Sequence, residues 1–72
     1  MKKFKIYLTE RLDHAEMGEM IGPTGCRINS YDRDLMCITV QALHDDVNVK
    51  SIKQAIHRDY IDSLGSVESA FG

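Results

Sequence analysis

The start of the chain alternates between apolar and polar side chains. In KFKIYLT, the apolar residues Phe4, Ile6 and Leu8 are separated by lysines and by Tyr7. A period of two is typical of a strand that buries one face. The pattern therefore predicts a strand near the N-terminus.

The next segment, LDHAEMGEMIGP, carries the signals of a short helix. Asp13 is a typical N-cap residue, and Glu16 lies three positions later, as in a capping box. Gly22 suits the left-handed residue that ends many helices, and Pro23 cannot continue one. The sequence therefore predicts a helix over residues 14–21.

A second helix is predicted after HDDVNV. Asp46 or Asn48 can cap its start, and Gly65 ends it, so the predicted helix covers residues 49–64. Its apolar positions recur at helical spacing. They are Val49, Ile52, Ala55, Ile56, Tyr60 and Leu64.

The stretch between the helices contains a Gly-x-x-Gly motif. The segment GEMIGPTGCRI, residues 18–28, resembles the KH domain, a module that binds RNA and single strands. The resemblance implies that Gly22 and Gly25 clamp a nucleic-acid backbone, with Arg27 beside the clamp and Ile28 packed behind it. It also implies a helix directly after the loop.

The residues after that loop favour a hairpin over a helix. Most residue types in CRINSYDR, residues 26–33, rank in the lower half of the helix-propensity scale. A loop formed by residues 32–34 sorts the flanking strands into an apolar and a polar face. The predicted opposite pairs are Ile28 with Ile38, Cys26 with Val40, and Ser30 with Met36.

Together these elements predict an α+β fold, a small two-layer sandwich in the order β-α-β-β-α. Its three-stranded antiparallel sheet would carry two helices on one face. Residues 1–65 form the single domain, and residues 66–72 form a flexible C-terminal tail. Cys26 and Cys37 would point to opposite faces, so we expect both thiols to stay reduced and Cys37 to label faster.

Composition limits the classes of function. The 72 residues are 43% apolar and 28% charged, as in soluble globular chains. A net charge of −2 offers no overall basic field for nucleic acid or membranes. No apolar run approaches a membrane span or a signal peptide, and only two cysteines occur, so we expect a cytoplasmic protein.

Catalytic motifs are missing from the sequence. His14, His44 and His57 form no zinc-binding spacing, and GPTG lacks the lysine and hydroxyl residue that follow a phosphate-binding loop. No nucleophile elbow occurs. We therefore expect a protein that is not an enzyme and has no metal or cofactor.

The helices of the predicted fold leave one face of the sheet bare. Aromatic, basic and apolar side chains gather there, as in binding interfaces. We expect a small accessory protein, an adaptor or inhibitor of the kind that viruses and mobile elements encode, that binds a partner protein or a second copy. The alternative is a single-stranded RNA or DNA binder, either through the KH-like loop or through the sheet. The predicted interface is Lys5, Tyr7, Arg27, Asn29, Tyr31, Leu35, Cys37 and Thr39.

Overall fold

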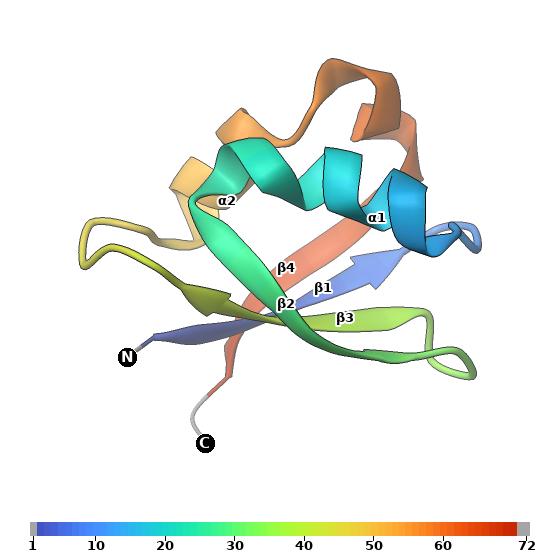
Figure 1. The fold of residues 1–72 in the computed structure, drawn as a ribbon, viewed down its shortest axis with the longest axis horizontal. Coiled ribbons are helices and arrows are strands. Elements are labelled where there is room, and N and C mark those ends of the chain that lie inside the picture. The colour runs from blue at the N-terminus through green and yellow to red at the C-terminus, as the bar shows by residue number, and fades with distance from the viewer. Residues whose placement is uncertain (1, 71–72) are drawn as a thin grey trace.

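The structure is a computed structural model that describes residues 2–70. Its four strands form one antiparallel sheet in the order β2-β3-β1-β4. The helical segments all lie on one side of this sheet (Figure 1). In chain order the elements are β1 (Lys3–Leu8), α1 (His14–Ile21), η1 (Gly22–Thr24), β2 (Cys26–Asp32), β3 (Cys37–Ala42), α2 (Val49–Ala55), η2 (Arg58–Ser63) and β4 (Leu64–Ala70), where η denotes a 3₁₀ helix.

The α+β class and the antiparallel sheet are confirmed, but the sheet has four strands and not three. The additional strand, β4, contains residues 66–70, which were predicted to form a flexible tail. It pairs along the free edge of β1, where Val67 lies opposite Ile6 and is 7% exposed. This pairing satisfies backbone groups that a tail would leave to water. Residues 71–72 lie outside the described residues.

The first helix has its predicted bounds, but its end differs. Oδ1 of Asp13 accepts from the Glu16 amide at 2.8 Å, and Oε1 of Glu16 accepts from the Asp13 amide at 3.0 Å. Gly22 is right-handed and not left-handed, because Pro23 suits the first turn of the 3₁₀ helix that follows. Gly25, with φ 75°, is the left-handed residue that turns the chain into β2.

The second helix is shorter than predicted. Asn48 caps it through a reciprocal pair of 2.9 Å hydrogen bonds with Ser51. The helix ends where Ile56 takes a ψ of 133°, and the chain resumes as η2. Ile56 is nevertheless only 5% exposed. The apolar spacing of residues 49–64 therefore predicted correctly that Ile56 is buried, but not that the helix continues through it. The break lets the following residues turn back toward the edge of β1.

Residues 26–32 form a strand, so the helix that the KH resemblance implies is absent. The hairpin register also differs from the prediction, because Ile28 lies opposite Val40 and not Ile38. The turn is longer than predicted and brings Met36 into the left-handed region at φ 51°. An irregularity between Ile28 and Ser30 then reverses which face the later residues of β2 occupy.

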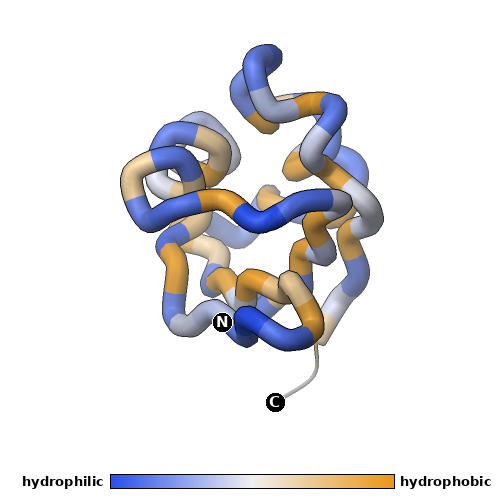
Figure 2. The backbone as a smooth tube through the Cα atoms, turned by 90° about the vertical axis from the view of Figure 1, so that its right-hand side faces the viewer, coloured by the Kyte–Doolittle hydropathy of each residue, from blue (hydrophilic) through white to orange (hydrophobic). Residues whose placement is uncertain are grey.

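The core lies between the helical layer and the inner face of the sheet. Apolar and polar segments alternate along the strands (Figure 2). On the predicted apolar face of the hairpin, Ile28 is 36% exposed on the edge strand and Met36 is only partly buried. The buried cluster is Phe4, Ile6, Leu8, Leu12, Met17, Met20, Ile21, Cys26, Ile38, Val40, Ala42, Val47, Ile52, Ile56 and Val67.

Candidate functional site

The sheet has one face that no helical segment covers in the part of the chain that the structure describes (Figure 1). We call it the open face. The register aligns Lys5 with Thr39 of β3 and Glu68 of β4 across the sheet, and Tyr7 with Cys37. The open face comprises Lys3, Lys5, Tyr7, Arg27, Asn29, Ser30, Asp32, Cys37, Thr39, Gln41, Ser66, Glu68 and Ala70.

Tyr7 organises the centre of the open face. Its hydroxyl donates to Oε1 of Glu68 at 3.2 Å, which ties β1 to β4. Partial burial, followed by this contact with Glu68, raises the pKa of Tyr7 above its ordinary range. Cys37 lies opposite Tyr7 and is only 5% exposed, although no helix covers it. The side chains of the open face therefore pack against one another into a continuous surface.

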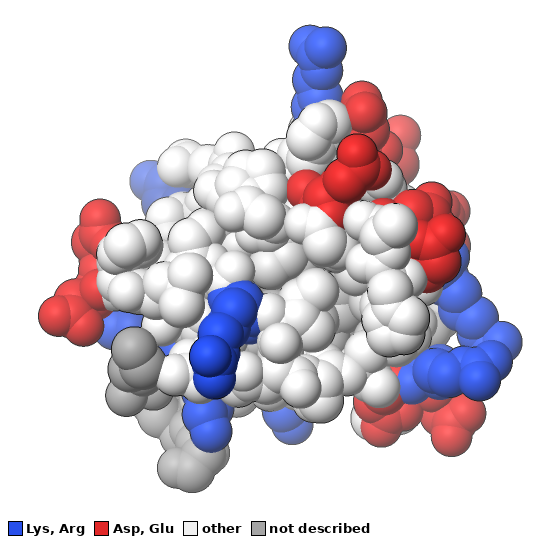
Figure 3. Space-filling model, viewed as in Figure 1, with Lys and Arg blue, Asp and Glu red and all other residues white. Residues whose placement is uncertain are grey.

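The open face carries three cations, Lys3, Lys5 and Arg27, and two carboxylates, Asp32 and Glu68. Lys3, Lys5 and Arg27 are exposed, and none of them forms a salt bridge with a described residue. The carboxylate of Glu68 is already bonded to Tyr7. Figure 3 shows that acidic side chains gather instead over the helical layer, at the upper right. The open face therefore has a net charge of +1, from three cations and two carboxylates, within a chain whose net charge is −2.

The structure gathers six of the eight predicted interface residues on the open face and moves two elsewhere. Tyr31 lies opposite Ile38 and packs against the core, because the irregularity in β2 reverses its side. Leu35 lies in the turn and is 63% exposed. Asn29 stays on the open face, where its Nδ2 donates to Oε1 of Gln41 at 3.3 Å.

Seven residues of the open face were missing from the predicted interface: Lys3, Ser30, Asp32, Gln41, Ser66, Glu68 and Ala70. Ser66 and Glu68 could not be placed, because the two strongly apolar residues of LGSVESA, Leu64 and Val67, lie three positions apart and show no strand alternation. Lys3 and Gln41 could have been predicted on this face, because they occupy polar positions in the alternating patterns of β1 and β3. They flank the centre, opposite each other.

The proposed nucleic-acid clamp does not have the geometry that the resemblance implies. Gly22 belongs to η1, and Gly25 is followed at once by β2, so the loop does not join two helices. A Cβ atom on Gly25 would lie 3.3 Å from Cγ2 of Val47. Gly25 is therefore required by its left-handed conformation and by close packing.

Other chemistry is sparse among residues 2–70. No group of three or more histidine, cysteine, aspartate or glutamate residues is placed to hold a metal ion there. None of the helices described is both long and apolar enough to cross a membrane. Burial raises the pKa of both Cys26 and Cys37, which keeps these thiols protonated near neutral pH.

Comparisons of the chain with protein-family models, with curated proteins and with solved structures give no significant match.

Proposed function

We propose that this chain is a small accessory protein that acts without catalysis and binds an acidic surface of a partner protein through its open face. The unpaired cations Lys3, Lys5 and Arg27 around the packed pair of Tyr7 and Cys37 support this proposal. A positive face selects partners of opposite charge and speeds their encounter. Tyrosine and arginine are also enriched among the residues that contribute most to binding.

The same surface favours a protein partner over a single strand of nucleic acid. Stacking platforms present several exposed aromatic rings to successive bases. The open face has one tyrosine, Tyr7, whose hydroxyl is bonded to the carboxylate of Glu68. A carboxylate among the cations also opposes binding of a phosphate backbone. We place this role in the cytoplasm, where free thiols such as those of Cys26 and Cys37 persist.

Charge reversal on the open face tests the proposal. Partners are captured from a lysate of the native source with the wild type, Lys5→Glu, Arg27→Glu and the control Lys50→Glu, whose charge lies on α2. A photo-crosslinker at Thr39 identifies what contacts the face. We expect each open-face reversal to weaken the crosslinked protein's binding on the order of tenfold, whereas Lys50→Glu leaves it unchanged.

Two outcomes contradict the proposal. Equal capture by all four proteins places the interface elsewhere. Capture that nuclease abolishes, with an affinity that falls steeply as salt rises, shows a nucleic-acid partner. Circular dichroism of each variant confirms that the fold is retained before binding is compared.

A further inference from the structure

One edge of the sheet is formed by β2, which pairs with β3 on one side and with no described strand on the other. In Figure 1 this strand crosses in front of β1 and β4, and no described segment lies in front of it. The surface in that view carries few charged side chains, which gather mostly at its rim (Figure 3). The outer backbone groups of β2 are therefore accessible to another strand.

The two edges of the sheet differ in how well their apolar side chains are covered. Val67, at the edge formed by β4, is 7% exposed. Ile28 points to the inner side of the sheet from the middle of β2 and is 36% exposed. The lysine and proline residues that protect many edge strands are absent from β2. Of the two edges, β2 thus leaves more apolar surface for a pairing strand to cover.

Arg27 and Asp32 carry opposite charges near the two ends of β2. They are five positions apart, so in a regular strand they would point to opposite faces of the sheet. The irregularity after Ile28 instead places both on the open face, opposite Gln41 and Cys37. Neither of these two charges forms a salt bridge with a described residue.

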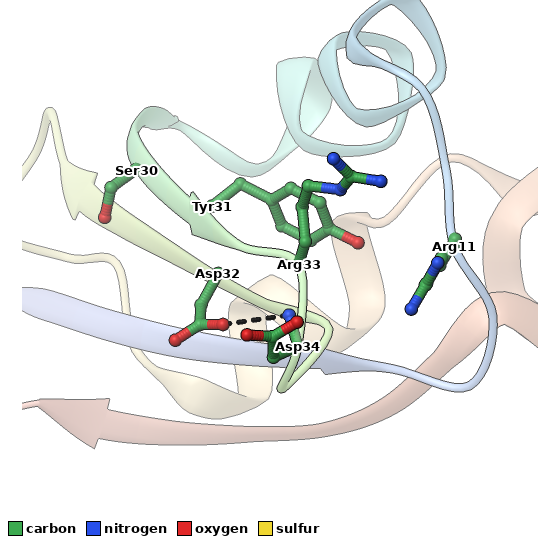
Figure 4. A pocket seen from close by; sticks show the side chains of 6 residues that line it. All are labelled: Arg11, Ser30, Tyr31, Asp32, Arg33 and Asp34. Carbon is green, nitrogen blue, oxygen red and sulfur yellow. Dashed lines mark hydrogen bonds between the residues drawn. The ribbon is translucent and has the colours of Figure 1, made fainter.

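The hairpin turn holds the carboxylate of Asp32 in a fixed position. Its Oδ1 accepts from the amides of Asp34 and Leu35, at 3.0 and 3.1 Å. In Figure 4 the side chains of Ser30 and Asp32 point to one side of β2, and that of Tyr31 points to the other. The carboxylate is therefore placed on the open face, with Oδ2 left to accept from a cation.

These features make β2 complementary to itself. In an antiparallel pair of two β2 strands, Arg27 of each copy can lie opposite Asp32 of the other on the open face. The same register puts Ile28 opposite Tyr31 on the inner face, and the irregularities of the two strands meet at its centre. We propose that β2 pairs with β2 of a second copy of the chain in this register, which joins two four-stranded sheets into one of eight strands. Opposite charges and pairs of aromatic and β-branched side chains, placed in this way, stabilise neighbouring strands.

The dimer leaves the open face uncovered. A two-fold axis between paired strands of one sheet is perpendicular to that sheet, so the open faces of both copies lie on the same side. The association needs no other protein, so the purified chain alone tests it.

Sedimentation of the full chain, from micromolar to millimolar concentration, tests for the dimer. A contact made by one seven-residue strand from each copy is small, so we expect a reversible association that increases across this range. In a mixture of isotope-labelled and unlabelled chains, intermolecular NOEs between Ile28 and Tyr31 should report the register. A monomer at every concentration, or intermolecular contacts through another element, overturns the proposal.

Variants separate strand pairing from general attraction. Ile28→Lys puts a charge at the middle of the edge and should abolish the dimer, whereas Ile61→Lys, at a 56% exposed position of η2, should leave it unchanged. Arg27→Asp should weaken dimerisation severalfold, and Lys50→Asp, on α2, is its matched charge control. Asp32→Asn should also weaken the dimer while keeping an acceptor for the turn amides. After circular dichroism has shown that each variant is folded, equal effects of a variant and its control overturn the proposal.

Discussion

The hydroxyl of Tyr60 donates a 2.5 Å hydrogen bond to Oε2 of Glu19, which joins η2 to α1. This bond, with smaller contributions from burial and from the neighbouring carboxylates of Glu16 and Asp59, raises the pKa of Tyr60 to about 12. The ordinary value is about 10. The bond therefore stabilises the fold fully below pH of about 10, and this contribution is lost as the pH rises toward 12.

A spectrophotometric titration of tyrosinate checks this prediction. We expect a late ionisation step near pH 12 in the wild type. Tyr60→Phe should remove that step, and Glu19→Gln should lower it, because the acceptor is then uncharged. Tyr7→Phe should leave the step in place. A late step that survives in Tyr60→Phe would assign it to another tyrosine.

The capping box of α1 gives a stability prediction. Asp13→Ala should lower the free energy of unfolding by about 1 kcal/mol, because the Glu16 amide loses its acceptor. Denaturant unfolding with a constant m-value measures the change. Asp46→Ala removes an exposed carboxylate that does not cap α2, whose N-cap is Asn48, and serves as the control. Equal midpoints for the two variants would contradict the cap's role.

Two glycines should respond in opposite directions to alanine. Gly18 lies within α1, where a Cβ would meet nothing within 4 Å, so Gly18→Ala should stabilise by about 0.5–1 kcal/mol. Gly25 has φ 75° and a Cβ would press on Val47, so Gly25→Ala should destabilise by at least about 1 kcal/mol. Thermal midpoints of both variants test the pair, and a shift in the same direction would contradict it.

The parts of the fold that were predictable are those determined by nearby residues. The first helix had its bounds predicted because Asp13 and Glu16 cap each other across a single turn. The alternation around Ile6 likewise placed β1. In both cases the interactions that decide the structure connect positions close in sequence, so the pattern alone carried the information.

Long-range pairing decided what the sequence could not show. Leu64 and the residues after it become a strand because β1 offers an open edge, more than fifty residues earlier in the chain. The hairpin register depends on a longer turn at Met36 and on an irregularity after Ile28. Since a one-residue shift moves a side chain to the other face of the sheet, Tyr31 left the predicted interface and packs against the core.

The strand β4 should be essential to stability and not a dispensable tail. Val67→Ala removes two buried methyl groups and should cost about 2 kcal/mol, from transfer and cavity terms together. Ser69→Ala, at an exposed position of the same strand, is the control and should change little. Unfolding midpoints distinguish the two. Equal effects would mean that β4 does not pack on the sheet.

The last prediction concerns the thiols. Cys37 lies on the open face but is as buried as Cys26, at 5% and 6% exposure, so the wild type should label slowly at both positions. Burial raises both pKa values, so labelling should accelerate as the pH rises. Tyr7 is the register partner of Cys37 across β1 and β3. We infer that the Tyr7 ring is the cover.

Removing that ring should expose one thiol selectively. We expect Tyr7→Ala to increase the labelling rate of Cys37 at least tenfold while leaving Cys26 slow, because Cys26 belongs to the core on the opposite face. Tyr7→Phe keeps the ring and should stay slow, which separates coverage from the loss of the hydroxyl. Mass spectrometry of labelled peptides assigns the sites. Parallel acceleration of both cysteines would instead show that Tyr7→Ala loosens the whole domain, since only global opening reaches both faces.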